Sequence, residues 1–232
     1  MAMYLIKSIS IFFVILFFND AYAFSVDSLF KVDNGKENYL LLKNTSGRTE
    51  FVNVRLSHIE VEKGKSVERE FKSDDFMQWP VYATPSSVIL DPGGAERVSL
   101  VRVNNDNFDD VLIGISLLPD TLSAFGNSVD ISVGYKTWFL IPGKSDFKGE
   151  LLASMKDASM LVLDNKTNKH LSIVLSQCGA DTFTDNDCAS TLFMLSGTQK
   201  QINLSKLKKL SDSKIYIRYS DANQKTVKFI TM

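Results

Sequence analysis

Apolar and polar residues alternate along much of this chain, with a period of two. The stretch VDISVGYKTW, residues 129–138, places Val129, Ile131, Val133 and Tyr135 between polar or small residues. This period is typical of a β-strand that has one apolar face and one polar face. The apolar face of such a strand packs either on the core of its own domain or on another chain.

The same pattern, rich in Val, Ile, Leu and aromatic residues, recurs throughout the chain. It covers residues 38–44, 49–61, 86–103, 110–119, 128–142, 159–165, 170–178, 190–196, 214–220 and 225–232. Turn signals such as Asp91-Pro92-Gly93-Gly94 separate the strands at roughly the spacing of a β-sandwich. DNKTNK, residues 164–169, predicts a hairpin-like turn. Because no segment keeps a helical period, we expect any helices to be short.

A change of composition near residues 141–150 predicts a domain boundary. All five prolines lie between positions 80 and 142, and Pro, Gly and alternating charges follow the apolar strand at this point. The fold class that we expect is all-β, with two β-sandwich domains. We place them at residues 24–143 and 144–232, the second being the smaller.

The first 23 residues predict a secretory signal peptide. Lys7 precedes an apolar run that ends near Phe18, and Ala21-Tyr22-Ala23 provides small residues for cleavage. The run is about ten residues long, half of what a membrane-spanning helix needs. We therefore expect removal of residues 1–23 and export of the remaining chain, without membrane insertion.

Charge and cysteine content narrow the function further. The formal net charge is −1, without the clustered basic excess of a nucleic-acid-binding protein. The chain has two cysteines, Cys178 and Cys188, with a polar segment between them. In an exported protein such a pair predicts a disulfide that closes the loop.

The sequence offers little for catalysis, a cofactor or a metal. His58 and His170 fall in different predicted domains, without a second ligand at metal-binding spacing. The hydrolase and phosphate-loop motifs are missing from the sequence. The carboxylate pairs at 74–75 and 109–110 lie in turn-like polar stretches, where we interpret them as solvated loop residues. We expect Trp79 and Trp138 to lie in a core or a domain interface.

Three stretches resemble the periplasmic chaperones of the chaperone/usher pilus pathway. They are YLLLKNTSGRTEFVNVRLSHIE (39–60), VYATPSSVILDPGGAERVSLVRV (81–103) and DISVGYKTWFLIPG (130–143). The loop between Cys178 and Cys188 is similar to that of the alternative branch, which serves common-pilus and colonisation-factor fimbriae.

The resemblance implies two immunoglobulin-like domains set at an angle, with a pilus subunit bound in the cleft by donor-strand complementation. The implied donor residues are Val129, Ile131, Val133 and Tyr135, whose apolar face the subunit would cover. The implied anchors for the subunit's terminal carboxylate are Lys31 and Lys136, with Arg55 and Arg102 in reserve. An outer-membrane usher is the implied second partner, and we expect the free protein to protect the apolar strand, for example by self-association.

Two other classes of protein remain open at this point. A pilus subunit or tip adhesin would also be exported, β-rich and disulfide-bonded, and FSVDSLFKV (24–32) partly alternates, as a donor extension would. A secreted enzyme or carbohydrate-binding module would need clustered exposed aromatic residues around its site.

Overall fold

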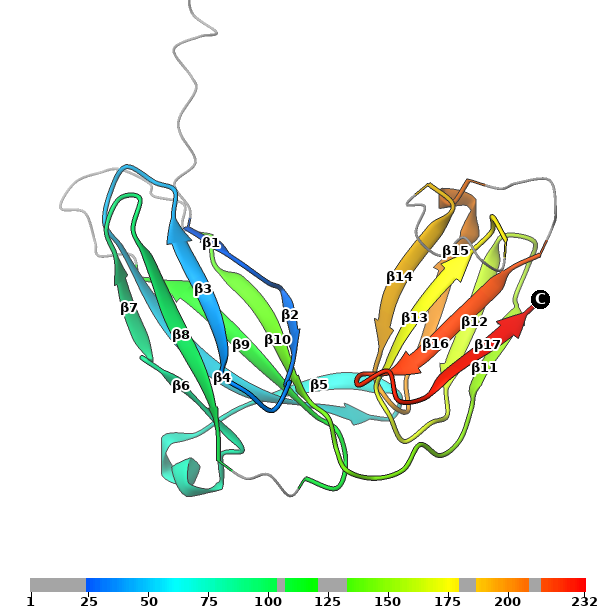
Figure 1. The fold of residues 1–232 in the computed structure, drawn as a ribbon, viewed down its shortest axis with the longest axis horizontal. Coiled ribbons are helices and arrows are strands. Elements are labelled where there is room, and N and C mark those ends of the chain that lie inside the picture. The colour runs from blue at the N-terminus through cyan, green and yellow to red at the C-terminus, as the bar shows by residue number, and fades with distance from the viewer. Residues whose placement is uncertain (1–23, 104–106, 121–132, 180–186, 209–213) are drawn as a thin grey trace, which may run out of the picture.

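The structure is a computed structural model that describes residues 24–103, 107–120, 133–179, 187–208 and 214–232. The predicted signal peptide lies outside these residues. The described chain forms two β-sandwiches, so the expected all-β fold class is confirmed (Figure 1). The helices in this part of the chain are two short 3-10 segments, η1 (Ser73–Gln78) and η2 (Leu204–Lys206), as expected.

The first sandwich has two sheets that share one apolar core. One sheet contains, in spatial order, β1 (Phe24–Val26), β3 (Asn38–Asn44), β8 (Ala95–Arg102) and β6 (Val81–Thr84). The other contains, in spatial order, β2 (Phe30–Val32), β10 (Tyr135–Ile141), β9 (Val111–Pro119), β4 (Glu50–Glu62) and β5 (Lys65–Glu70), and β7 (Ser87–Leu90) also pairs with β4.

Period-two alternation determines which side chains enter this core. In β9, Ile113, Ile115 and Leu117 are fully buried, and in β10 Phe139 and Ile141 are fully buried too. The intervening residues of both strands face the opposite side of the sheet. That opposite face is the side on which the second sandwich lies.

The second sandwich is smaller and has its own core. One sheet contains, in spatial order, β11 (Leu151–Met155), β12 (Met160–Asn165) and β15 (Gln199–Asn203); the other contains β14 (Ala189–Met194), β13 (Leu171–Ser176), β16 (Tyr216–Asp221) and β17 (Val227–Thr231). Its buried core includes Leu161, Leu163, Ile173 and Ile217. The domain boundary between residues 143 and 144 stays a prediction.

The expected hairpin at residues 164–169 is wrong. β12 and β13 belong to different sheets, so this turn carries the chain from one sheet to the other. The buried Asn165 organises the corner, because its Nδ2 donates to Lys169 O at 3.0 Å and its Oδ1 accepts from Thr167 N at 3.0 Å. Asn and Asp side chains commonly replace backbone hydrogen bonds in this way at turns.

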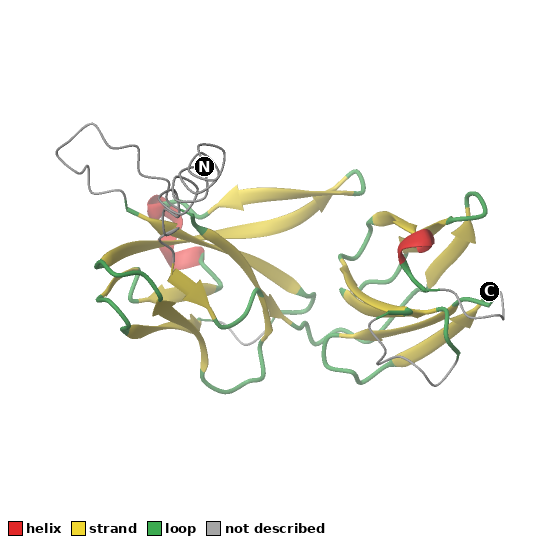
Figure 2. Cartoon of the chain, turned by 90° about the horizontal axis from the view of Figure 1, so that it is seen from above, coloured by secondary structure: helices red, strands yellow, loops and turns green. Residues whose placement is uncertain are grey.

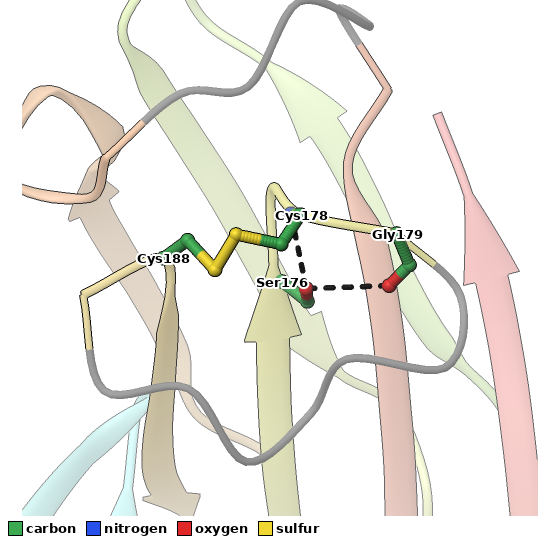
Figure 3. The surroundings of a disulfide bond; sticks show 4 residues. All are labelled: Ser176, Cys178, Gly179 and Cys188. Carbon is green, nitrogen blue, oxygen red and sulfur yellow. Dashed lines mark hydrogen bonds between the residues drawn. A yellow bond between two sulfur atoms is a disulfide. The ribbon is translucent and has the colours of Figure 1, made fainter.

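The expected disulfide joins Cys178 to Cys188 beside the end of β13 (Figure 3). Cys188 is fully buried, and Gln177 N donates to Cys188 O at 2.9 Å. Ser176 Oγ donates to Gly179 O at 3.3 Å and accepts from Cys178 N at 3.2 Å. The bond therefore ties the end of a central strand to the strand that follows the loop.

The two sandwiches stand at an angle, like the arms of a V (Figure 1). The segment between β10 and β11 joins them at the base, and the long β4–β5 hairpin extends from the first sandwich toward the second (Figure 2). At the hairpin tip, a Cβ placed on Gly64 would lie 3.8 Å from Gly197 O of the second sandwich.

A buried ion pair fixes the junction. Asp110 Oδ1 accepts from Gly143 N at 2.8 Å and from Lys169 Nζ at 3.2 Å, while Oδ2 accepts from His170 N at 2.9 Å. The side chains of Asp110 and Lys169 are 3% and 5% exposed. The interpretation of Asp110 as a solvated loop residue is therefore wrong, because its carboxylate joins the two sandwiches.

Replacing Asp110 with Asn should destabilise the protein strongly. The change leaves Lys169 buried without its counter-charge, which costs about 3–5 kcal/mol in comparable buried pairs. We expect a lower midpoint of urea unfolding. Asp109→Asn is the matched control, because Asp109 is exposed, and equal midpoints for the two variants would contradict the structural role of Asp110.

Replacing both cysteines with Ser should lower the free energy of unfolding by about 2–3 kcal/mol, the chain-entropy value for so short a loop. Urea unfolding measures this loss. A reducing agent should shift the midpoint of the unsubstituted protein by a similar amount and leave the Ser variant unchanged. A shift of equal size in both proteins would contradict the role of the disulfide.

Candidate functional site

β10 is open to a further strand over its first residues. On one side it pairs with β9 along its whole length, from Tyr135 to Ile141. On the other side it pairs with β2 over Trp138, Phe139 and Leu140. Within the described residues, no strand pairs with Tyr135–Thr137 on that second side. The backbone there can accept an extended segment of another chain.

Of the four predicted donor residues, two lie within the described part of the chain, at this open end of β10. Tyr135 is partly buried and packs on the core, with its ring 5.1 Å from that of Phe24. Val133, two residues earlier, is 49% exposed. Val129 and Ile131 lie outside the described residues. The four donor assignments therefore stay a prediction.

The face of β10 opposite the core carries Lys136. Its Nζ forms an ion pair with Glu68 of β5 and donates to Ser116 Oγ at 3.0 Å and to Ser57 Oγ at 3.3 Å. Ser57 Oγ donates in turn to Glu68 Oε1 at 2.6 Å. The hydrogen bond from Lys136, followed by the one from Ser57, holds the pKa of the Glu68 carboxyl below its usual value.

A glycine makes this arrangement possible. A Cβ placed on Gly114 of β9 would lie 2.5 Å from Ser57 Oγ and 2.9 Å from Lys136 Nζ. Both distances are shorter than real side chains allow, so any larger residue would displace the lysine or the serine. Gly114 thus leaves room for the ammonium group to lie across the surface of the sheet.

Arg55 lies in the same cross-strand row as Lys136. Arg55 of β4 and Lys136 of β10 both pair in register with Ser116 of β9, so the three side chains share one face. Arg55 Nη1 lies 3.5 Å from Glu70 Oε1, in an exposed ion pair. A small cavity of about 140 Å³ lies at this row. Its lining includes Arg55, Ser57, Glu68, Glu70 and Ser116.

The other two candidate anchors lie elsewhere. Lys31 pairs in register with the core-facing Phe139, and its Nζ donates to Asp27 Oδ2 at 2.8 Å and to Tyr39 O of the opposite sheet. Arg102 donates to Asp33 Oδ2 at 2.8 Å. The structure therefore brings Lys136 and Arg55 together and does not bring Lys31 to them.

An apolar cavity of about 850 Å³ lies between the sandwiches. Phe30 and Trp138 contribute from the first sandwich, and Leu192 and Phe193 from the second. The rings of Phe30 and Phe193 are 4.4 Å apart. Because Trp138 and Lys136 occupy the same face of β10, the apolar cavity and the cationic row lie on one continuous surface.

The sequence patterns did not identify Ser57, Ser116, Glu68 or Glu70. Alternation in KSVERE (65–70) could have placed Glu68 and Glu70 on one face, but the pairing of β5 with β4 was not predicted. Within the described ranges, His, Cys, Asp and Glu form no group of three or more able to hold a metal, and no helix there could cross a membrane.

Comparison with known proteins gives the family. The family model for the CS5 fimbrial protein N-terminal domain matches residues 26–142, which make up half of the chain. The chain belongs to this family. A protein described as "Uncharacterized 25.9 kDa protein in CS5 3'region", from Escherichia coli, is 28% identical over 185 residues, or 78% of this chain and 81% of that protein.

Solved structures share the fold of this family member at low sequence identity. The crystal structure of the class 5 fimbriae chaperone CfaA is 13% identical, with a TM-score of 0.55 over 90% of this chain and 97% of that one. A chain from the Salmonella enterica SafA pilin in complex with the SafB chaperone is 10% identical, with a TM-score of 0.55 over 92% and 98% of the two chains. The two-domain immunoglobulin-like fold is thus common to this chain and pilus chaperones.

Replacing Lys136 with Met should raise the pKa of Glu68 toward its usual value. The ion pair with Lys136 lowers this pKa. Its contribution to the stability of the folded protein is therefore complete at a pH above the usual pKa of a Glu side chain, and it is lost as the pH falls through the lowered pKa of Glu68. Carboxyl ¹³C NMR against pH measures the change. Arg69→Met is the control, because Arg69 pairs with Glu60 and Glu62 instead. A Glu68 pKa unaffected by Lys136→Met would contradict the pairing.

Proposed function

We propose that this protein is a periplasmic chaperone that binds a pilus subunit by donor-strand complementation and delivers it to an outer-membrane usher. The observation that carries the proposal is that no described strand pairs with one edge of β10 over Tyr135–Thr137. This edge follows residues 129–135, in which apolar side chains alternate with polar or small ones. An extended segment of a subunit would pair with this edge through backbone hydrogen bonds.

The face of β10 supports the donor role. Thr137, Phe139 and Ile141 face the core at 0% exposure, and the same odd-numbered register contains Val133, Ile131 and Val129. If the strand continues in the subunit complex, these side chains would extend the apolar surface beyond the sandwich. They would then complete the core of the subunit and cover an edge that otherwise aggregates.

Lys136 and Arg55 are the anchors that we propose for the terminal carboxylate of the subunit. They lie in one row on the face toward the second sandwich, and Ser57 and Ser116 provide hydroxyl groups beside them. Charge-assisted hydrogen bonds to a carboxylate are stronger than neutral ones. The apolar cavity on the same surface would receive side chains of the subunit.

The names of related proteins point in the same direction. The family model is that of a fimbrial protein, and the structures that share the fold include a class 5 fimbriae chaperone and a chaperone complex with a pilin. The pilus-subunit alternative is not favoured, because those structures match nearly the whole chain, including both sandwiches.

Ile131→Asp should abolish capture of the subunit. A charge on the apolar face of the donor strand would be buried without a partner in the subunit core, which is strongly unfavourable. The tagged protein is isolated from the periplasm of its native host, and mass spectrometry identifies any secreted β-protein that co-purifies in stoichiometric amount.

Ser132→Asp is the matched control, because it adds the same charge on the opposite face of the predicted strand. We expect this variant to retain the partner. Loss in both variants, retention in both, or no partner with the unsubstituted protein would contradict donor-strand complementation by this segment.

A further inference from the structure

Both cations of the Arg55–Lys136 row are already neutralised by glutamates of one strand. Glu68 and Glu70 are two residues apart in β5 and therefore share a face. Glu68 pairs with Lys136, and Glu70 pairs with Arg55. The row thus binds carboxylates in this structure, and the chain itself supplies them.

The contacts of Lys136 leave no donor for a second carboxylate. An ammonium group has three N–H donors. In this structure Lys136 Nζ has three acceptors, which are a Glu68 carboxylate oxygen, Ser57 Oγ and Ser116 Oγ. A carboxylate from outside could bind Lys136 fully only after Glu68 leaves, because two carboxylates at one cation would also repel each other.

Glu68 is placed so that it can leave. β5 is the last strand of its sheet and pairs with β4 alone among the described strands. The side chain of Glu68 is 48% exposed, whereas that of Lys136 is 29% exposed. The carboxylate can therefore rotate into water and become fully hydrated, while Lys136 keeps its contacts with Ser57 and Ser116.

We propose that Glu68 occupies the anion site of Lys136 and Ser57 in the unbound protein as a substitute for the terminal carboxylate of a captured chain, which displaces it. This inference rests on the proposed function for the source of the incoming carboxylate. Glu68 then makes the site selective, because a ligand lacking a carboxylate cannot compensate for the lost ion pair.

Acetate is the probe for the exchange. ¹H–¹⁵N spectra of the purified protein follow the backbone amides of Ser57, Gly114 and Ser116 during an acetate titration, with sodium chloride at equal ionic strength as the reference. Glu68→Gln should bind acetate with an apparent Kd at least fivefold lower than that of the unsubstituted protein. Glu60→Gln is the matched control, because Glu60 lies in the same hairpin and pairs with Arg69, and it should match the unsubstituted protein.

A second substitution locates the site. Lys136→Met in the Glu68→Gln background should remove the gain in acetate binding. Acetate binding that is no tighter in Glu68→Gln than in the unsubstituted protein overturns the proposal. A gain that survives Lys136→Met overturns it too, since the acetate would then lie elsewhere.

The acetate result is independent of the proposed function. If no form of the protein captures a subunit, the chaperone proposal fails, and the titration still decides whether Glu68 blocks the anion site. If a subunit is captured, Glu68→Gln should release it at least threefold more slowly than Glu60→Gln does. Equal release rates would overturn the claim that the captured chain displaces Glu68.

Discussion

The structure depends on one asymmetry: β10 is paired fully along one side and partly along the other. Its pairing with β9 fixes the register of the whole sheet, and this register places Phe139 in the core and Lys136 on the opposite face. Its pairing with β2 ends at Trp138, and no other strand in the described part of the chain pairs with that side, so the strand begins with an open edge there. Because a strand has two faces and two edges, one segment can stabilise its own domain and still present backbone groups and a cation to another chain.

The two kinds of ion pair in this protein differ in environment, and the difference suits different tasks. Asp110 and Lys169 are nearly inaccessible to water, and three donors converge on the carboxylate, so the junction between the sandwiches behaves as a fixed joint. Glu68 and Lys136 are partly exposed, so water can replace either partner at small cost. A permanent contact needs the first arrangement, and an exchangeable one needs the second.

The sequence predicts most of the strands, because alternation and turn residues are local properties. The segments at 38–44, 110–119 and 190–196 correspond closely to β3, β9 and β14. Sheet membership is a non-local property, and for this reason the turn around Asn165 joins two sheets although the local pattern predicts a hairpin.

The site depends on non-local pairing in the same way. Lys136 could be proposed from the resemblance to the pilus chaperones. Its row with Arg55 and its partner Glu68 depend on the pairing of β10, β9, β4 and β5, which no local pattern encodes. Asp110 was predicted to be solvated, because a polar stretch in a turn usually lies in water. Its carboxylate is instead buried against Lys169 of the second sandwich.

An internal carboxylate at Lys136 changes what a captured chain gains by binding there. Exchange of one carboxylate for another at the same cation leaves the number of ion pairs unchanged, so the electrostatic contribution to affinity is small. The free energy of capture must then come mainly from backbone pairing along β10 and from burial of apolar side chains. The cation still imposes a condition, because a chain that pairs out of register brings no carboxylate to Lys136, and Glu68 stays in place. On this argument the row selects the register of the bound chain, while the open edge and the apolar surface supply most of its affinity.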